Sequence, residues 1–145
     1  LDKMAQKGYP KAYVLPKARL QGEFDFSFSG LKTAVLNLTK KLTLDGSPLP
    51  KEDVAASFQE CITSTLFGKT LKAAEKYNIK QIVLGGGVAA NSEIRNKFFA
   101  LREKGYKIYA PAMKYCTDNA SMIASAAYFL TNTTDSLDVE VFSRC

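Results

Sequence analysis

Hydrophobic and polar positions follow two different periods along this chain, and the periods predict a mixture of strands and helices. Residues 24–28 alternate strictly between apolar and polar side chains, which predicts a half-buried strand. Apolar residues then recur every three or four positions over 31–43, so we expect a helix there, with Ser29 as its N-cap. A second helix is expected over 53–77, and Pro50 marks its start.

After residue 80, short apolar runs alternate with helical patterns. Residues 81–84 predict a buried strand, and residues 106–110 predict a second one. The helix between them would carry Ile94, Phe98 and Leu101 on one face. Because a helix connects the two strands, we expect them to be parallel neighbours in one sheet.

A last helix is expected over 119–130, capped by Thr117. Its apolar residues would face the sheet, and these are Met122, Ile123, Ala126, Ala127 and Leu130. The order strand, helix, strand, helix predicts an α/β fold. We expect a largely helical subregion over 20–80, a βαβα core over 81–130 and a loosely ordered acidic tail over 131–145.

Composition narrows the chemistry that the chain can perform. The chain has 145 residues, 46% of them hydrophobic, and no histidine, which excludes catalytic or zinc sites built on its own histidines. Its cysteines lack paired spacing and predict free thiols in a reducing cytoplasm; they are Cys61, Cys116 and Cys145. No apolar run is long enough for a membrane span. A start at Leu1 resembles neither an initiator methionine nor a signal peptide, so we expect a longer parent protein.

The positive charge is concentrated in two stretches. The net charge is +6, from 20 lysines and arginines against 14 acidic residues. Residues 1–19 and residues 93–114 each carry an excess of about four positive charges, as counted from the sequence. Such an excess fits contact with a polyanion such as RNA, although lysines that only keep the protein soluble would look the same.

Three consecutive glycines, Gly85 to Gly87, lie between the first predicted strand of the core and the helix that follows it. Bare backbone at the carboxyl end of a strand is a common place for a ligand. The run from Gly85 to Ala90 also fits the relaxed dinucleotide pattern G-x-G-x-x-A. The acidic residue that this pattern expects after the next strand is missing, so a nicotinamide-dependent oxidoreductase is an alternative rather than the preferred interpretation.

Two polar residues near the glycines could bind a ligand or simply cap a helix. Asn91 lies at the start of the helix after the glycine turn, and Ser92 beside it can serve as the cap, which would leave the Asn91 amide free for a ligand. Asp118 follows the second strand and would lie at the same sheet edge. The turn and residues 117–119 could therefore flank one pocket, with Asp118 available to a metal.

Three segments together resemble one protein family. They are Asp25-Phe26-Ser27-Phe28-Ser29-Gly30-Leu31-Lys32-Thr33-Ala34, Gly86-Gly87-Val88-Ala89-Ala90-Asn91-Ser92 followed by Arg95, and Cys116-Thr117-Asp118-Asn119-Ala120 followed by Met122-Ile123-Ala124. In order and spacing they resemble the TsaD family, the tRNA N6-adenosine threonylcarbamoyltransferases, in older descriptions the glycoprotease family. The run Ser-Gly-Leu-Lys-Thr, which contains Lys32, resembles the bacterial branch of this family.

The resemblance implies the carboxyl-terminal half of an actin-like ATPase fold with added helices. It also implies transfer of threonylcarbamoyl from threonylcarbamoyl-adenylate to N6 of adenosine 37 in tRNAs that read codons beginning with A. Gly86, Gly87 and Asn91 would contact the adenylate or ATP. Asp118 would be one ligand of a divalent metal, iron or zinc, and a His-x-x-x-His motif outside this chain would supply the others.

The same resemblance implies tRNA and TsaB-like and TsaE-like proteins as partners, with no membrane association. Because part of the metal site would lie elsewhere, we expect the isolated chain to have no transferase activity. Apolar surface that another part of the protein normally covers would make self-association possible. A module that only binds partners, without a ligand of its own, is a further alternative.

Overall fold

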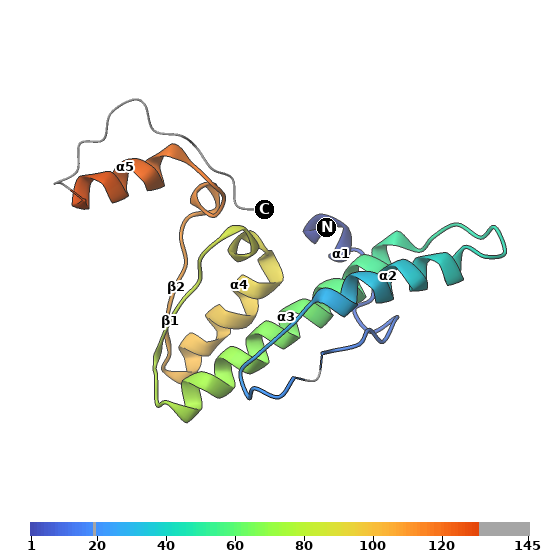
Figure 1. Cartoon of the computed structure of the whole chain (residues 1–145), viewed down its shortest axis with the longest axis horizontal. Coiled ribbons are helices and arrows are strands. Elements are labelled where there is room, and N and C mark those ends of the chain that lie inside the picture. Colours follow the sequence, from blue (N-terminus) through green and yellow to red (C-terminus); the bar gives the residue numbers. More distant parts are fainter. Residues whose placement is uncertain (19, 131–145) are drawn as a thin grey trace.

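The structure is a computed structural model that describes residues 1–18 and 20–130 (Figure 1). Within these ranges the helices are α1 (Asp2–Ala5), α2 (Ser29–Leu42), α3 (Lys51–Lys76), α4 (Ser92–Phe99) and α5 (Ala120–Phe129). Short 3₁₀ helices are η1 (Gly87–Ala90), η2 (Ala100–Lys104) and η3 (Met113–Tyr115), and the strands are β1 (Gln81–Val83) and β2 (Lys107–Tyr109). The mixture of helices and a sheet confirms an α/β fold.

The two strands β1 and β2 form a parallel pair in which Ile82 lies opposite Ile108. A further backbone hydrogen bond, from the N–H of Leu84 to the carbonyl of Tyr109 at 2.8 Å, extends the pairing beyond the end of β1. Helix α4 and η2 connect the strands, as the sequence predicts. Both strands therefore end at the same edge of the sheet, where the glycine turn begins.

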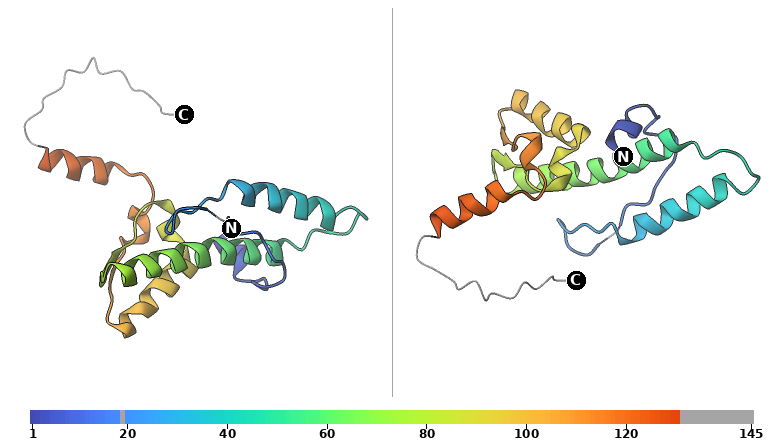
Figure 2. Two further views of the ribbon diagram at one scale, coloured as in Figure 1. Left: turned by 60° about the horizontal axis from the view of Figure 1, so that its bottom comes forward. Right: turned by 90° about the horizontal axis from the view of Figure 1, so that it is seen from above.

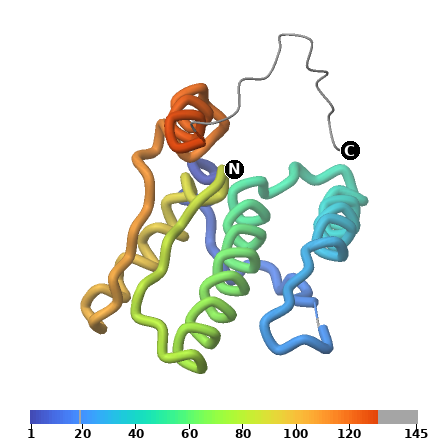
Figure 3. Tube along the Cα trace, turned by 60° about the vertical axis from the view of Figure 1, so that its left-hand side comes forward, coloured from blue at the N-terminus to red at the C-terminus, as the bar shows by residue number. Residues whose placement is uncertain are grey.

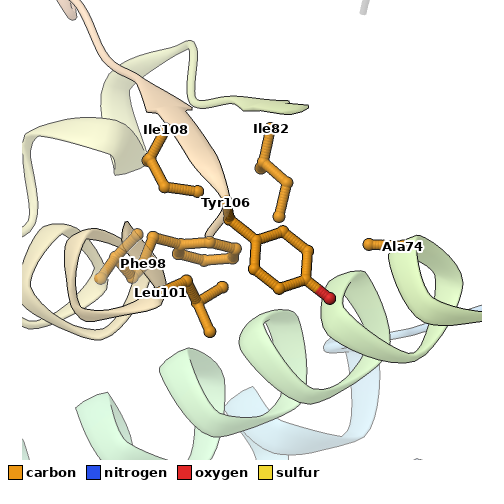
Figure 4. Close-up of a cluster of buried hydrophobic side chains, with 7 residues drawn as sticks. Ala74, Ile82, Phe98, Leu101, Tyr106 and Ile108 are labelled. Carbon is orange, nitrogen blue, oxygen red and sulfur yellow. The ribbon is translucent and has the colours of Figure 1, made fainter. Parts of the chain in front are cut away.

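The main hydrophobic core lies between this sheet and helices α3 and α4 (Figure 4). Its buried members are Ala74, Ile82, Ile94, Phe98, Leu101, Tyr106 and Ile108. The predicted apolar face of α4 and η2 is confirmed, because all three of its residues are in this cluster. The edge of the Phe67 ring packs against Phe98, with ring centroids 5.2 Å apart. This core fixes the position of both strands and of α4.

Only one face of the sheet is covered by the described residues. Ile82 and Ile108 point into the core, whereas Val83 is 69% exposed and Tyr109 is 51% exposed. The predicted burial of the whole first strand is therefore wrong, because parallel strands are buried on both sides only when helices cover both faces.

The helices α1 and α2, from the first part of the chain, both pack against the long helix α3 (Figure 3). It begins after Pro50, as predicted, and α2 lies alongside it, joined through a second buried cluster of Leu15, Leu31 and Cys61. Helix α2 begins two residues before the expected range of 31–43: Ser29 is its first residue and not its cap. The hydroxyl of Ser27 instead accepts a hydrogen bond from the Ser29 N–H, at 3.3 Å.

Residues 24–28 do not form the predicted strand. The segment begins in a bend, has no regular secondary structure and has no strand partner among the described residues, and a strand exists only when its backbone groups pair with a neighbour. Side chains hold it along α3 instead: Glu23 forms ion pairs with Lys72 and Lys76, and Phe24 packs against Tyr77.

Helix α5 also departs from its predicted position. It projects away from the sheet beyond the end of β2 (Figures 1 and 2), and none of its residues is buried. The apolar residues expected against the sheet are therefore exposed; these are Met122, Ile123, Ala126, Ala127 and Leu130. Its cap is Asn119, whose side chain accepts from the Met122 N–H, and not the predicted Thr117.

No helix within the described residues combines the length and the apolar character needed to cross a bilayer. Cys61 and Cys116 are free and buried, in agreement with the predicted thiols. Arg19, Cys145 and the predicted tail over 131–145 lie outside the described residues. The boundary expected at residue 80 between a helical subregion and a βαβα core stays a prediction.

The buried end of η2 provides a test of this core. Leu101 is 2% exposed, so Leu101→Ala should lower the free energy of unfolding by about 2–5 kcal/mol, through lost burial and the cavity left behind. Leu44 is 86% exposed, and the matched change Leu44→Ala should shift stability by no more than about 0.5 kcal/mol. Urea unfolding followed by circular dichroism measures both, and equal losses would contradict the packing described here.

Candidate functional site

The glycine turn begins where β1 ends, and its backbone takes a conformation that only glycine adopts easily. Gly86 has φ +78° and ψ 174°, a region essentially closed to residues with a Cβ atom. The chain then enters η1, whose buried residue Ala89 anchors the turn to the core side of the sheet. The geometry places the exposed backbone of Gly85, Gly86 and Gly87 at the carboxyl end of β1.

These three glycines have free space around them. A Cβ atom built on any of them would meet no atom of the described chain within 4 Å. Packing within the described residues therefore does not require glycine at Gly85 or Gly87, whereas the positive φ requires it at Gly86. Unobstructed backbone of this kind can approach a bound molecule closely.

Asn91 is the N-cap of α4. Its side-chain oxygen accepts a hydrogen bond from the Ile94 N–H at 3.0 Å, which is the normal capping bond. The expectation that Ser92 would take this role and leave the Asn91 amide free is therefore wrong. The Asn91 amide nitrogen donates to Gln59 Oε1 at 2.8 Å and to Asp2 Oδ1 at 3.3 Å.

The first residues of the chain are part of this network. The carboxylate of Asp2 accepts from the Ser92 N–H at 3.2 Å and from the Ser92 hydroxyl at 2.8 Å. Gln6 adds a hydrogen bond to the same hydroxyl at 3.0 Å. A carboxylate at the start of α4 is also favoured by the helix dipole. Helix α1 is thereby attached to the start of α4, next to Asn91.

A pocket of about 340 Å³ opens beside Asn91. Its lining residues come from α1, α3, the glycine turn and α4, and they include Asp2, Gln59, Thr63, Gly87, Val88 and Asn91. Gly86 is not among the lining residues. Of the predicted site residues, the structure therefore brings Gly87 and Asn91 together at one cavity.

A cluster of charged side chains supports one wall of this pocket. Thr63 is 2% exposed and donates to Glu93 Oε1 at 2.7 Å. Lys97 Nζ lies 2.8 Å from Glu93 Oε1 and 2.6 Å from Glu60 Oε2. Because one lysine serves two carboxylates within a partly buried cluster, the charges hold α3 against α4.

Burial and hydrogen bonding act in opposite directions on this cluster. Burial opposes ionisation of Glu93, but hydrogen bonds from Lys97 and Thr63 outweigh it and lower the pKa of the carboxyl group. Burial likewise disfavours the charged form of Lys97, and the carboxylates of Glu60 and Glu93 outweigh it and raise the lysine pKa. Glu93 and Lys97 therefore both carry their charges at neutral pH.

Arg95 joins the glycine turn to the loop that follows β2. Its Nε donates to the carbonyl of Ala89 at 2.6 Å, and its Nη2 donates to the carbonyl of Pro111 at 2.6 Å. The same Nη2 lies 3.1 Å from Cys116 Sγ. The loop over 111–116 is thus joined to η1, next to the glycine turn.

Asp118 does not complete the predicted pocket. Its side chain is exposed and does not line the cavity beside Asn91. Among the described residues no group of three or more histidine, cysteine or acidic side chains is placed to hold a metal. A carboxylate can provide one of the ligands of a divalent cation, but a metal site needs several ligands, so Asp118 alone does not form one. The expectation of one cavity shared by Asn91 and Asp118 is therefore wrong for this chain by itself.

The sequence analysis did not identify the polar residues of α3 that reach the pocket. Gln59 and Thr63 lie four positions apart on one face of α3, together with Ala55. A row of small and uncharged polar residues on a lysine-rich helix indicates a buried face, and this pattern could have revealed them. Asp2 gives no comparable signal, because its partners are about 90 residues away in the sequence.

Comparisons with known proteins agree with the resemblance seen in the three sequence segments. The family model described as TsaD, tRNA N6-adenosine threonylcarbamoyltransferase, matches residues 1–125. A protein with that name from Mesoplasma florum is 47% identical, and the match covers 88% of this chain and 41% of the relative. Another, from Thermosipho melanesiensis, is 46% identical, and the match covers 97% of this chain and 42% of the relative. A relative in Synechococcus sp. strain JA-3-3Ab is 43% identical over 99% of this chain and 40% of its own length.

The chain thus spans about two fifths of the length of these curated relatives. Among solved structures, a crystal structure of HypF from T. kodakarensis matches 88% of this chain and 16% of that chain, with a TM-score of 0.57 and 19% identity. At that identity the likeness shows the fold alone.

The hydrogen bond between Gln59 and Asn91 can be tested directly. Gln59→Leu keeps the volume of the side chain but removes the acceptor, so it should cost about 1 kcal/mol of stability. It should also shift the NMR signals of the Asn91 side-chain amide. The matched change Gln81→Leu, at an exposed position of β1, should cost no more than about 0.5 kcal/mol. Unchanged Asn91 signals in Gln59→Leu would contradict the contact.

The Glu93 cluster predicts a dependence of stability on pH. Ionised Glu93 stabilises the folded chain above a pH of about 4.5, the ordinary glutamate pKa, and this contribution disappears as the pH falls through the lowered pKa. The stability difference between the native chain and Glu93→Gln should therefore be largest near neutral pH and shrink below pH 4.5. Urea titrations at several pH values measure it, with Glu103→Gln at an exposed position as control. A difference that grows in acid would refute the charged cluster.

Proposed function

Because this chain belongs to the TsaD family of tRNA N6-adenosine threonylcarbamoyltransferases, we propose that it forms the carboxyl-terminal part of such an enzyme. The reaction is transfer of threonylcarbamoyl from threonylcarbamoyl-adenylate to N6 of adenosine 37 in tRNAs that read codons beginning with A. The observation that carries this proposal is the family match over residues 1–125, together with relatives above 40% identity over nearly the whole chain. The relatives are longer, so the complete activity belongs to the whole protein.

The proposed architecture is one half of an actin-like ATPase fold. The parallel pair of β1 and β2, with its connecting helix and a glycine turn at the carboxyl end, is compatible with such a half. Residues 24–28, which have no regular secondary structure, and the uncovered face of the sheet are where further elements could pack. The HypF likeness supports a related fold and says nothing about activity.

The glycine turn and Asn91 are the proposed adenylate contacts. The free space above Gly86 and Gly87 lets backbone N–H groups approach a phosphate or ribose, which a side chain would prevent. Gly87 and Asn91 share the pocket of about 340 Å³, and this supports a joint role. When Asn91 binds a ligand, its amide can exchange the long 3.3 Å bond to Asp2 for the ligand while Gln59 keeps it oriented.

Asp118 is the proposed metal ligand of this chain. Its exposed carboxylate is free to coordinate a cation, and the remaining ligands of an iron or zinc site would come from outside the chain. A bound metal would act as a Lewis acid that stabilises negative charge developing on the transferred group or on the phosphate. Asp118 contributes negative charge and one oxygen donor to that site.

The basic surface supports tRNA as the substrate. Lys3, Lys7, Lys11 and Lys17 are all exposed, and together they give the first stretch its positive charge. Contacts with phosphates provide most of the affinity in non-specific RNA binding. TsaB-like and TsaE-like proteins are the proposed protein partners.

The family match favours this function over the two alternatives. A nicotinamide-binding domain would need a carboxylate at the end of the second strand, and β2 is followed by Ala110 and Pro111. No observation specifically supports a module that only binds partners.

A chimeric protein tests the proposal. This chain would replace the aligned segment of the Synechococcus relative, whose alignment covers 99% of it, and transfer of threonylcarbamoyl to tRNA would be measured. We expect an active chimera. Asn91→Ala should raise the KM for the adenylate about tenfold, the effect of losing about 1.4 kcal/mol of binding, and Asp118→Asn should lower kcat at least about tenfold.

Matched changes on the same surfaces serve as controls. Asn96→Ala, at an exposed position of α4, and Asp45→Asn, in the exposed loop after α2, should leave both constants within about twofold. The 145-residue chain assayed alone should show no transfer. An inactive chimera that folds and binds tRNA, or an active isolated chain, would overturn the proposal.

A further inference from the structure

We propose that Arg95 is a positioning residue that holds the loop over 111–118 against the glycine turn, and so fixes where Asp118 lies relative to Asn91. The roles of Asn91 and Asp118 rest on the proposed function, whereas the attachment of the loop rests on the structure alone. Arg95 was noted in the sequence only as a residue that follows the glycine segment.

The contacts of Arg95 join three separate parts of the chain. Its guanidinium group donates to the carbonyl of Ala89 in η1, to the carbonyl of Pro111 at the start of the loop after β2, and to the sulfur of Cys116. These partners lie 6, 16 and 21 residues from Arg95. A single side chain thereby connects the turn after β1 with the loop after β2.

No other described side chain makes this connection. Within residues 1–18 and 20–130, the side-chain hydrogen bonds that join residues 111–118 to earlier parts of the chain all come from Arg95; the one other bond from outside the loop is local, from Asn119 Nδ2 to the Thr117 carbonyl at 2.9 Å. The bonds that the loop makes by itself are local, such as those from the N–H groups of Tyr115 and Cys116 to Ala112 and Met113. Without Arg95 the loop would lose its attachment, and its local turns would open more often.

The position of Arg95 on α4 couples it to Asn91. It lies one helical turn after Asn91, and its N–H donates to the Asn91 carbonyl at 3.2 Å. Cys116, the farthest of its three partners, is two residues before Asp118. The same turn of α4 therefore presents Asn91 to the pocket and holds the segment that carries Asp118.

Arginine has the shape that this role needs. Its planar, always charged guanidinium offers several N–H groups in fixed directions, so it can bind two carbonyls and a sulfur at once. A lysine at this position would keep the charge but would present a single nitrogen on a flexible stem. We therefore expect Arg95→Lys to weaken the attachment of the loop, as Arg95→Met does, but to a smaller extent.

Hydrogen exchange on the 145-residue chain tests the attachment without any assay of activity. In Arg95→Met the amides of Tyr115 and Cys116 should exchange about tenfold faster than in the native chain, because the loop opens more often. The amides of β1 and α4 should keep their protection, which shows that the fold is intact. Should Arg95→Met lose protection in α4 as well, Arg95→Lys provides the same comparison with a smaller change.

Arg102 offers a matched control. It also donates from Nη2 to a backbone carbonyl, that of Ile108 at 2.7 Å, and it packs on the Phe99 ring. Arg102→Met removes the same kind of bond at the middle residue of β2, outside the loop over 111–118. It should leave the exchange of Tyr115 and Cys116 within about twofold. Native exchange rates at these two amides in both Arg95 variants would overturn the proposal, whatever the enzyme does.

The chimeric enzyme tests the positioning role itself. Arg95→Met should lower kcat and the amount of bound iron or zinc at least about tenfold, the range seen when groups that orient a metal ligand are removed, while the KM for tRNA stays within about twofold. Arg102→Met should change none of the three. If the chimera with Arg95→Met kept the metal content and kcat of the unchanged chimera, the positioning role would be refuted. If the unchanged chimera were inactive while Arg95→Met still sped up amide exchange at Tyr115 and Cys116, the proposed function would be refuted and the attachment of the loop would stay supported.

Discussion

The packing of α4 beneath the parallel strands is the constraint on which the rest of the described structure depends. Ile82 and Ile108 are buried side by side against Phe98 and Leu101, and this core fixes the ends of both strands. The glycine turn and the loop after β2 leave the sheet at the same edge as a result. Polar contacts then refine a proximity that the hydrophobic core has already created.

Those polar contacts all involve the first turn of α4. Asn91 caps the helix and binds Gln59 of α3, while Asp2 binds the neighbouring Ser92. Arg95 attaches the loop after β2. Four segments far apart in the sequence thus meet at one helix start, and three of them, α1, α3 and the start of α4 with the glycine turn before it, line the pocket beside Asn91.

The sequence predicted the elements whose periodicity is local. Helices α2, α3 and α4, the strand pair and its parallel direction follow from apolar spacing, and the buried face of α4 was correct to the residue. The prediction failed where the described residues supply no partner: residues 24–28 have a strand pattern without a partner strand among them, and the apolar face of α5 has no surface among them to cover. Long-range hydrogen bonds, such as the one that the Ser92 N–H donates to Asp2, do not produce any periodic pattern in the sequence. The glycines indicated where a candidate site could lie, and the pattern of small and polar residues on α3 could have indicated Gln59, whereas nothing in the sequence indicated that Asp2 binds the Asn91 amide.

The backbone of Gly86 has a consequence for how this segment can vary. At φ +78° and ψ 174°, any other amino acid would bring strain of about 1–3 kcal/mol into the folded chain, whether or not a molecule is bound. Gly85 and Gly87 meet no such barrier within the chain, since a methyl group on either would point into open space. Selection for folding alone would therefore protect the middle glycine, and only selection for what approaches from outside would protect its two neighbours.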